Sequence, residues 1–515
     1  MPTLLRIEAV NLRYVISDTE DLSTRRGGSF MLLDAINDIS QAFAKKLKPI
    51  STGASIGLFE VIQHTTELQS EVEAFLQQKN QSEKKPYCHA TFTVSQVQDP
   101  DFRAVVEKAL AANRWQQLRH LNFVSHWGES APSVCPLDAV RPASSHSYLP
   151  GQQKSKLSHS VADRRKAGRD LRQTVYQRIL QDKQFDLSFT NDTESLSTFD
   201  PDQYPELPAN LNGKMAVFYA DGNSFGKIQR DCKTPNELLD WDQAIKNKRQ
   251  ALLKDLLAWL QTNGRSHQGN DLRFETLLWG GDELLFLLPA WLGLAFARQF
   301  FALTKNWTYK EKPLKHATGL VFAKHSTPIS SLQTLAKQLA EHGKQNDETR
   351  KANTLSWVVL ESFDNTGNQL DAYWQRNGIF KDAQGNDGWQ QLLLSEDRLD
   401  KLCAMQPLKE ALPRSALIRV LRSIAAGQYA KENALIQRSY ASARAALPAA
   451  EQQAVLTALW AAFGVGFDSP PEDAGAVWAQ QQAVPWTALL ELWDYILPPV
   501  ACTANRQTTS PQEVA

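Results

Sequence analysis

The chain has 515 residues, of which 42% are hydrophobic and 22% are charged, proportions that suit a globular protein with several cores. Its 56 basic and 56 acidic residues cancel, which excludes a basic nucleic-acid-binding surface over the whole molecule and leaves RNA contacts to local patches or partners. The five cysteines are too scattered for a disulfide framework, the start has no signal-peptide pattern, and no apolar run is long enough to cross a membrane. We therefore expect a cytoplasmic protein.

Residues 1–125 alternate predicted strands with predicted helices. The strands are expected at Leu4–Ile16, Ile56–Ile62 and Ala90–Val97, and the helices at Gly28–Leu47 and Phe102–Arg114. This is a ferredoxin-like order of elements. The hairpin position, Thr52–Leu58, has no carboxylate at its tip, so we interpret Asp18, Glu20 and Asp21 as a solvated or helix-capping cluster.

Residues 126–212 form a predicted connector. Cys135, His126, Asp138 and His146 are candidate zinc ligands, but tetrahedral structural sites usually have paired thiolates, so structural zinc is not expected. The basic stretch that follows has two open interpretations, a solvated helix start or a contact with RNA phosphates. Its basic residues are Lys154, Lys156, Arg164, Arg165, Lys166, Arg169 and Arg172. Residues 191–212, rich in Asp, Ser and Pro, indicate a linker.

Two motifs dominate residues 213–362. An apolar strand ends in Asp-Gly-Asn-Ser-Phe-Gly at 221–226, and a leucine-rich helical pattern follows it. Two apolar runs then fold on the turn Gly-Gly-Asp-Glu at 280–283, where glycine supplies the positive φ that a hairpin tip needs. If these strands pair side by side, Asp221 meets Asp282 and Glu283. Three carboxylates would repel one another there without a cation, and their hard oxygens suit Mg²⁺ or Mn²⁺.

Such a cluster can perform phosphoryl or nucleotidyl transfer with two metal ions. One ion lowers the pKa of the attacking hydroxyl, and the other neutralises the leaving pyrophosphate. Glycines at 222, 280 and 281 would let a triphosphate approach the backbone amides. The alternative is an acidic hairpin turn and an unrelated turn after a strand. The order of the two motifs on a strand–helix–hairpin frame favours the metal site.

The segment after the hairpin adds a further pattern. His316–Ile329 is a predicted strand that ends in a polar turn, and it precedes an amphipathic helix at Ser331–Lys344 and a strand at Leu355–Leu360. Together with Asp-Gly-Asn-Ser-Phe-Gly-Lys at 221–227 and Gly-Gly-Asp-Glu at 280–283, it resembles the Palm (cyclase) domain in the large subunit of type III CRISPR–Cas effector complexes. The resemblance to diguanylate cyclases is more distant. The family's usual turn is Gly-Gly-Asp-Asp, so Glu283 departs from it by one methylene.

The resemblance implies a fold class and a set of site residues. The fold class is α+β, with two ferredoxin-like Palm domains of the GGDEF/polymerase type, a small connector module and a helical C-terminal domain. The catalytic residues would be Asp221, Asp282 and Glu283, and the metal ligands would be these three with Gly222. The residues expected to bind nucleotide are Gly222, Asn223, Ser224, Phe225, Gly280, Gly281 and Lys344, the last of which matches a family lysine that meets the triphosphate.

The resemblance also implies a reaction and partners. ATP molecules bound between the two Palms, with Mg²⁺ or Mn²⁺, would be joined into cyclic oligoadenylates, and the first Palm would be catalytically silent. The partners would be guide-RNA-containing effector subunits and target RNA, with no membrane. The family's zinc module has Cys-x-x-Cys before Arg-Pro, and Asp138 replaces its second cysteine here. No adjacent His-Asp pair occurs, so we expect no HD nuclease domain. A non-catalytic scaffold subunit and a stand-alone cyclic nucleotide synthase remain as alternatives.

The remaining predictions concern single residues and the C-terminal part. Lys227 and Arg230 either reach phosphates or lie on a surface helix, Trp279 packs in its strand, and His325 is a hydrogen-bonded turn residue. Residues 363–398 are a predicted loop-rich excursion, 399–502 a helical bundle and 503–515 a disordered tail. The helices of the bundle are expected at Leu408–Leu412, Ser415–Ala425, Lys431–Ala446, Glu451–Gly464 and Trp486–Ile496.

Overall fold

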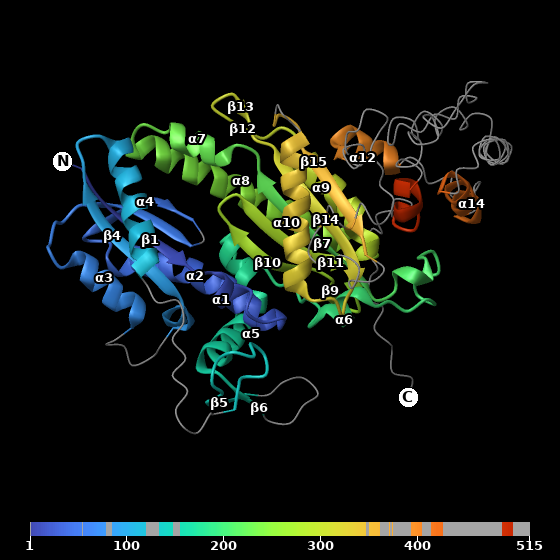
Figure 1. The fold of residues 1–515 in the computed structure, drawn as a ribbon, viewed down its shortest axis with the longest axis horizontal. Helices are drawn as coiled ribbons and strands as arrows, with labels where there is room; N and C mark the ends of the chain where they lie inside the picture. The colour runs from blue at the N-terminus through green and yellow to red at the C-terminus, as the bar shows by residue number, and fades with distance from the viewer. Residues whose placement is uncertain are drawn as a thin grey trace, which may run out of the picture.

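The computed structural model of this chain is a mixed α/β protein with two larger sheets. It describes residues 2–53, 55–78, 85–119, 133–147, 155–346, 350–360, 370, 373, 393–403, 414–425 and 487–497. The two sheets lie side by side, the first in blue at the left of Figure 1 and the second in green and yellow at its centre. No helix within the described ranges is long and apolar enough to span a membrane.

The first unit is built on a four-stranded antiparallel sheet with the strand order β2-β3-β1-β4. Its elements are β1 (Thr3–Val10), α1 (Arg13–Ile16), α2 (Leu22–Ala42), β2 (Leu47–Thr52), β3 (Ile56–Val61), α3 (Leu68–Gln77), β4 (Thr91–Gln98) and α4 (Phe102–Arg119). Side chains from alternate positions of β1 enter different cores, as the period of two in a strand requires. Leu5 and Ile7 pack with α2 and α3, whereas Leu4 packs with α4 on the opposite face.

The first strand and the first helix of this unit have other bounds than predicted, and the helix ends at Ala42 instead of Leu47, where β2 begins. The strand predicted at Leu4–Ile16 ends at Val10, because Asn11 adopts the left-handed conformation (φ 60°) and residues 13–16 form α1. The helix predicted to begin at Gly28 begins at Leu22, where the Asp21 side chain accepts a hydrogen bond from the backbone N–H of Thr24 at 2.8 Å. The acidic cluster therefore supplies the cap, as one of its two interpretations stated.

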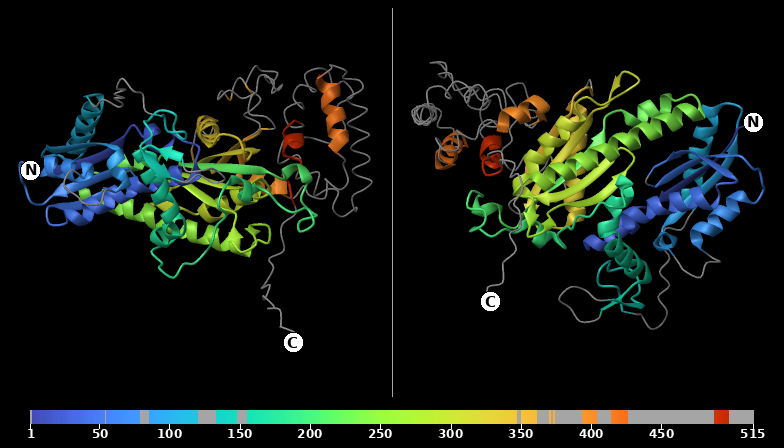
Figure 2. Two further views of the ribbon diagram at one scale, coloured as in Figure 1. Left: turned by 90° about the horizontal axis from the view of Figure 1, so that it is seen from below. Right: turned by 180° about the vertical axis from the view of Figure 1, so that it is seen from behind.

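The second unit has a six-stranded sheet with the order β10-β11-β7-β14-β15-β16, in which β14 and β15 are parallel. Its first four strands repeat the spatial order of the first unit. The elements are β7 (Lys214–Gly222), α7 (Phe225–Asp231), α8 (Pro235–Thr262), β10 (Glu275–Gly280), β11 (Glu283–Pro289), α9 (Gly293–Thr304), β14 (His316–Lys324), α10 (Ile329–Asn346), β15 (Thr354–Val359) and β16 (Leu394–Ser395). Helices α8 and α9 cover one face of this sheet and α10 covers the other (Figures 1 and 2).

The units share a hydrophobic core. Leu4 and Leu58 of the first sheet belong to the same buried cluster as Phe225 of α7 and Trp241 of α8. Figure 2 shows α8 running from the first unit across the face of the second sheet. The sheet of the first unit thus packs against α7 and α8, the two helices that follow β7, the strand that contains Asp221.

The connector is organised around α5 (His159–Leu180), which packs along α2. Two strands, β5 (Ser145–Ser147) and β6 (Ser155–Leu157), form a small hairpin before it. Helix α6 (Thr193–Ser197) and the strand pair β8 (His267–Gln268) and β9 (Asp271–Leu272) lie near the far end of the second sheet. In the C-terminal part, α12 (Glu396–Cys403) and α14 (Arg414–Ala425) are described, and residues 487–492 are helical. The predicted helices at 408–412, 431–446 and 451–464 and the tail at 503–515 lie outside the described residues.

The basic stretch of the connector has two buried arginines, while Lys156, Lys166 and Arg169 are exposed. Arg164 is fully buried and its guanidinium pairs with Asp18 at 2.8 Å, and buried Arg165 pairs with Asp21 at 3.3 Å. Neither a solvated helix face nor an RNA contact describes these two arginines, and Asp18 is not a solvated acid. For Arg164, Arg165 and Asp18 the predictions were wrong, because they treated the two charge clusters separately, while the fold pairs them. Lys166 and Arg169 are exposed on α5, so both interpretations remain open for them.

Glycines allow α2 and α5 to pack closely. A Cβ atom at Gly27 of α2 would lie 1.9 Å from the carbonyl oxygen of Arg164, and one at Gly168 of α5 would lie 1.8 Å from that of Ser23. Both contacts are with backbone, which cannot rotate away as a side chain can. The two helices therefore meet at a distance that only glycine permits at these positions.

We expect Gly168→Ala to lower the free energy of unfolding by about 1–3 kcal/mol, the usual cost of forcing extra volume into a packed core. Alanine is the better helix former by about 1 kcal/mol, so a loss of stability would isolate the steric clash. The measurement is guanidinium-induced unfolding. Gly226→Ala on α7 is the matched control, because no atom lies within 4 Å of its Cβ position. Equal stabilities of the two variants would contradict the close crossing.

Candidate active site

The strand register places the predicted acids next to one another. Asp221, near the end of β7, is directly opposite Glu283, the first residue of β11. Glu283 also pairs with Gly280 of β10, so Gly281 and Asp282 form the tip of the hairpin. The backbone N–H of Gly222 donates to the carbonyl oxygen of Asp282 at 3.2 Å. The end of β7 and the hairpin tip are thus paired and hydrogen-bonded neighbours, as the pattern of apolar runs indicated.

The need for glycine is clear at two positions of the site, at Gly281 from its backbone conformation and at Gly222 from its close neighbour. Gly281 has φ +49°, in the left-handed region that favours glycine, and no atom lies within 4 Å of its Cβ position. A Cβ at Gly222 would lie 2.5 Å from the Phe225 ring. That ring is buried and packs edge-on against Trp241, with centroids 5.5 Å apart. The side chain of Phe225 therefore supports the loop from below, and a contact with nucleotide could come only from its backbone.

Asn223 and Ser224 shape the turn into α7. Ser224 has φ +63° at the N-cap of α7, and its side chain makes no capping hydrogen bond. Asn223 is buried, its N–H donates to the Lys315 carbonyl at 2.7 Å, and its Nδ2 donates to the Ala352 carbonyl at 3.3 Å. Within the described residues, its Oδ1 has no hydrogen-bond partner. Asn223 thus fastens the loop to the segments before β14 and before β15.

Two lysines of α10 reach the carboxylates. Lys344 forms an ion pair with Asp221, and Lys337 forms one with Glu283 at 3.2 Å. Lys344 was a predicted nucleotide contact, and in this structure its ammonium group lies beside Asp221 of β7. Lys337 was not predicted. Its signal is its spacing of seven residues from Lys344, which is about two helical turns and places both on one face of α10.

Burial leaves two carboxylates of the site, Asp221 and Asp282, poorly stabilised as anions. It raises the pKa of Asp221 from 3.8 to about 6, although the ion pair with Lys344 acts in the opposite direction. Burial also raises the pKa of Asp282. The pKa of the nearby Tyr219 hydroxyl is raised too, by burial first and then by the charge of Glu283. A group whose pKa rises in this way is one whose charged form is poorly stabilised.

The donor chemistry of the site fits a hard divalent cation. In the described part of the chain, no group of three or more His, Cys, Asp or Glu side chains lies close enough together to hold a metal ion. The acids instead meet lysine ammonium groups, which occupy the position of a positive charge beside Asp221 and Glu283. The carboxylate oxygens of Asp221, Asp282 and Glu283 are of the type that Mg²⁺ and Mn²⁺ bind.

The raised pKa of Asp221 predicts a pH dependence of stability in chelator-treated protein. The folded state binds this proton more tightly than the unfolded state, so the stabilisation is complete below pH 3.8 and is lost as the pH rises through about 6. Lowering the pH from 7 to 5 should therefore stabilise the wild-type chain by about 1 kcal/mol relative to Asp221→Asn. Urea unfolding at the two pH values measures this difference. The opposite sign would show that Asp221 is well stabilised as an anion.

His316 was missed as part of the support of the site. It pairs with Gly222 across β14 and β7 and is buried among aromatic rings, with Phe300 at 5.2 Å and Trp307 at 5.4 Å between centroids. Burial lowers its pKa to about 3, so the ring is neutral at physiological pH. Its backbone N–H donates to the Asn353 side chain at 2.9 Å. Sequence position gave no signal for this role, because the register of β14 against β7 decides it.

Four further residues were singled out in the sequence, and the structure shows where each of them lies. Lys227 and Arg230 are exposed on α7, just after the site loop. Trp279 lies under the guanidinium of Arg249, which is 4.6 Å from the ring centroid. The backbone N–H of His325 donates to the carbonyl of Gly213 at 2.9 Å, in the turn that was predicted for it.

The former zinc candidates are connected by a different set of interactions. The Asp138 carboxylate accepts hydrogen bonds from the backbone N–H groups of Val140 and Arg141, both at 3.0 Å, and pairs with the Arg141 guanidinium at 2.8 Å. Cys135 is fully buried in a small cluster with Leu157. His126 lies outside the described residues. Asp138 therefore stabilises the turn at residues 138–141 through its carboxylate.

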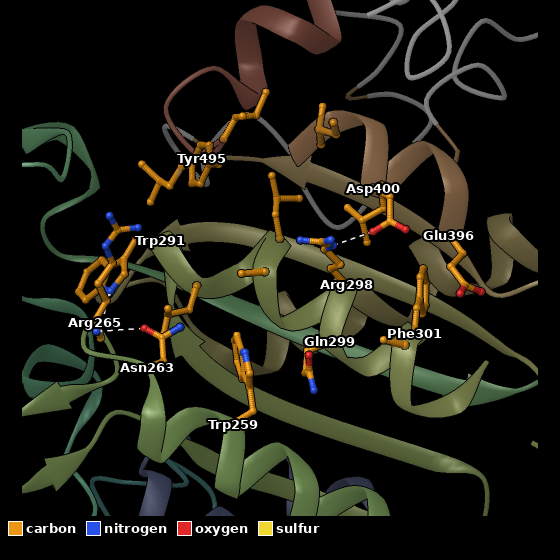
Figure 3. Close-up of a pocket in the computed structure, with 18 of the residues that line it drawn as sticks. Trp259, Asn263, Arg265, Trp291, Arg298, Gln299, Phe301, Glu396, Asp400 and Tyr495 are labelled. Carbon is orange, nitrogen blue, oxygen red and sulfur yellow. Dashed lines mark hydrogen bonds and ion pairs between the residues drawn. The ribbon is translucent and has the colours of Figure 1, made fainter. Parts of the chain in front are cut away.

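A separate cavity of about 650 Å³ lies on the other side of the second sheet, between α9, the end of α8 and the C-terminal segment (Figure 3). Aromatic side chains line it, including Trp259, Trp291 and Tyr495. Its charged residues are paired, for example Arg298 with Asp400 at 2.6 Å. None of the predicted site residues lines it, so we place the candidate active site at the acidic hairpin.

The fold and the site define a mixed α/β protein with an acidic hairpin tip beside the end of a buried strand. No family model and no curated protein matches the chain. Among solved structures, its neighbours include Csm1 chains of Csm1-Csm4 assemblies from the type III-A CRISPR-Csm complex. The match to the Csm1-Csm4 cassette in complex with AMPPNP has 12% identity and a TM-score of 0.40, and covers 69% of this chain and 54% of that chain. The match to the cassette in complex with cA4 has 13% identity and a TM-score of 0.46, and covers 96% and 70%.

The apo Csm1-Csm4 cassette gives a similar result, with 11% identity, a TM-score of 0.44 and coverage of 95% and 70%. The chain thus spans about half the length of the first of these neighbours and more of the other two. The function proposed below rests on the residues of the site.

Proposed function

We propose that this chain is the large subunit of a type III CRISPR effector complex and converts ATP to cyclic oligoadenylates when the complex recognises target RNA. The proposal treats the two sheet units as ferredoxin-like Palm domains, of which only the second is catalytic. The observation that carries it is the register of Asp221 opposite Glu283, beside the tip formed by Gly281 and Asp282. A metal-dependent nucleotidyl transferase needs carboxylates from two neighbouring strands at such an edge.

The repeated strand order supports this interpretation. The order β2-β3-β1-β4 in the first unit corresponds to β10-β11-β7-β14 in the second, so the two hairpins are equivalent elements. The first hairpin joins Thr52 to Ile56 and has no acidic residue between them. Only one of the two equivalent hairpins can therefore supply carboxylates, which fits one active and one silent Palm.

The residues of the second unit have distinct roles in the proposed reaction. Asp221, Asp282 and Glu283, with the backbone of Gly222, would hold Mg²⁺ or Mn²⁺, which supplies activation of a 3′-hydroxyl and neutralisation of pyrophosphate. The open backbone at Gly281 would admit phosphate oxygens. Lys337 and Lys344 would exchange their carboxylate partners for phosphate oxygens when nucleotide binds. The 3′-hydroxyl of one ATP would attack the α-phosphate of its neighbour, and pyrophosphate would leave.

The alternative function is a non-catalytic scaffold that holds guide RNA and companion subunits. The lysine pairs on Asp221 and Glu283 favour it, because ammonium groups can replace a cation permanently. A stand-alone cyclic nucleotide synthase would share the chemistry of the site without these partners. The two enzyme hypotheses differ only in whether activity needs the complex.

The test is incubation of the full chain with ATP and Mg²⁺ or Mn²⁺, alone and with companion subunits, guide RNA and target RNA. The proposal predicts pyrophosphate and cyclic adenylates when target RNA is present in the complex, and none from the Asp282→Ala variant. Products from the isolated chain would instead indicate a stand-alone synthase. Intact assembly without turnover, with every nucleotide and both metals, would leave the scaffold function.

A further inference from the structure

Arg249 of α8 lies behind the hairpin tip, and the sequence patterns did not single it out. Its side chain is buried, with 8% of the residue exposed. Its Nη1 donates to the carbonyl oxygen of Gly281 at 2.6 Å, and its guanidinium carbon lies 4.6 Å from the centroid of the Trp279 ring. One side chain therefore holds the hairpin tip at two points, by a hydrogen bond to the turn and by stacking on β10, the strand that leads into it.

This contact is chemically specific. A guanidinium is planar, so it can lie on an indole face and donate in its own plane at the same time, which an ammonium group cannot do. Burial disfavours the charged guanidinium and therefore lowers the pKa of Arg249 to about 10. The nearby negative charge of Asp282 acts in the opposite direction and raises this pKa. A buried cation with one carbonyl acceptor and one aromatic face is a costly way to stabilise an ordinary hairpin. Its position beside Asp282 gives a reason for it.

Helix α8 also contacts the hairpin of the first unit through the same side. Asp242 and Lys246 precede Arg249 by seven and three residues, so the three lie on one face of the helix. Asp242 accepts a hydrogen bond from Ser51 at 3.0 Å and pairs with Lys246 at 2.6 Å, and Lys246 donates to Thr52. The helix thus connects the acid-free hairpin of the first unit with the acidic tip of the second.

We propose that Arg249 is a positioning residue of the cation site. It fixes the Gly281–Asp282 turn so that the Asp282 carboxylate faces the cation, and it acts through the turn without touching the nucleotide. Asp242 and Lys246 hold the helix that carries it against the first unit. The proposal rests on the proposed function, because it requires that the acids bind a divalent cation.

The experiment compares Arg249→Met, Arg249→Lys and wild type in the full chain, with exposed Lys254→Met on the same helix as the matched control. Mn²⁺ binding is followed by the loss of the free-ion EPR signal. We expect Arg249→Met to weaken Mn²⁺ binding about 10- to 100-fold, the range found when an outer partner of a metal ligand is removed. Arg249→Lys should recover only part of this loss, since it restores the charge without the planar stack, and Lys254→Met should match wild type.

Hydrogen exchange and kinetics separate positioning from other roles. Peptides that span 278–286 should exchange about tenfold faster in Arg249→Met, while those of β14 should be unchanged, which also shows that the variant is folded. In the active complex, kcat should fall about 10- to 100-fold while the KM for ATP changes less than about twofold. An unchanged turn peptide, or a raised KM with normal Mn²⁺ affinity, would overturn the proposal. A wild-type chain that binds no Mn²⁺ and turns over no ATP would overturn the proposed function, and this inference with it.

Discussion

We expect the Asp282→Asn variant to form products from ATP more than about 100-fold more slowly than the wild-type chain in the assembled complex. Asparagine keeps the size of the side chain and replaces a charged oxygen donor with a neutral amide, which is a poor partner for Mg²⁺. The loss should exceed the 10- to 100-fold typical of residues that only support a metal ligand, because Asp282 is proposed to contact the ion itself. Initial rates of pyrophosphate release measure the effect.

The control for this variant is Asp255→Asn, the same substitution at an exposed position of α8. It should leave the rate unchanged, since Asp255 does not belong to the acidic tip. Asp282→Asn should also fold at least as stably as wild type in chelator-treated buffer, because burial already raises the pKa of this acid. A rate loss accompanied by unfolding would be uninformative about the metal, whereas a normal rate in the folded variant would contradict the proposed role of Asp282.

The sequence predicted the arrangement of the acidic tip because that arrangement depends on local patterns. An apolar strand, a long helix and two apolar runs on a glycine turn specify which strands can pair, and the register then places Asp221 opposite Glu283. Helix α10 was equally accessible, because the apolar spacing of residues 331–344 shows it directly. The start of α2 was placed six residues too late, because charged Arg25 and Arg26 precede its apolar stripe and their burial has no local signal.

Interactions between distant segments were not accessible in this way. Arg164 and Asp18 are 146 residues apart, and no sequence pattern around either residue indicates that they form an ion pair. The sequence does not distinguish Gly27 and Gly168 from other glycines in helices, because their role depends on the packing of α2 against α5. Arg249 and Lys337 belong to amphipathic helices, where a basic residue usually faces solvent. The residues that support the site were therefore identified only in the tertiary structure, while the acids themselves could be identified in the sequence.

The second large effect is expected at the buried ion pair that joins the two units. Arg26 of α2 and Glu275 of β10 form a two-pronged pair, in which the Arg26 Nε lies 2.8 Å from Glu275 Oε1 and the second nitrogen meets Oε2. Only 2% and 7% of the two side chains are exposed. Arg26 also donates to the carbonyl of Gly168 at 2.7 Å, so the pair includes α5 as well.

We expect Glu275→Leu alone to lower the free energy of unfolding by about 3–5 kcal/mol, because it leaves the Arg26 charge buried without a counter-charge. The double variant Arg26→Met/Glu275→Leu should recover most of this loss, since two apolar side chains of similar volume can replace a buried pair at little cost. The full double-mutant cycle, measured by guanidinium-induced unfolding, gives the coupling between the two residues.

The exposed pair Lys166–Asp170 on α5 provides the comparison for this cycle. Its side chains are 81% and 66% exposed, so Asp170→Asn should change the stability by less than about 1 kcal/mol. The same cycle tests whether the two units depend on each other. Because Glu275 begins β10, the strand that ends at the acidic tip, uncoupled single variants would mean that the first unit does not hold this strand. A coupling of several kcal/mol would instead show that the first unit is a structural support of the second.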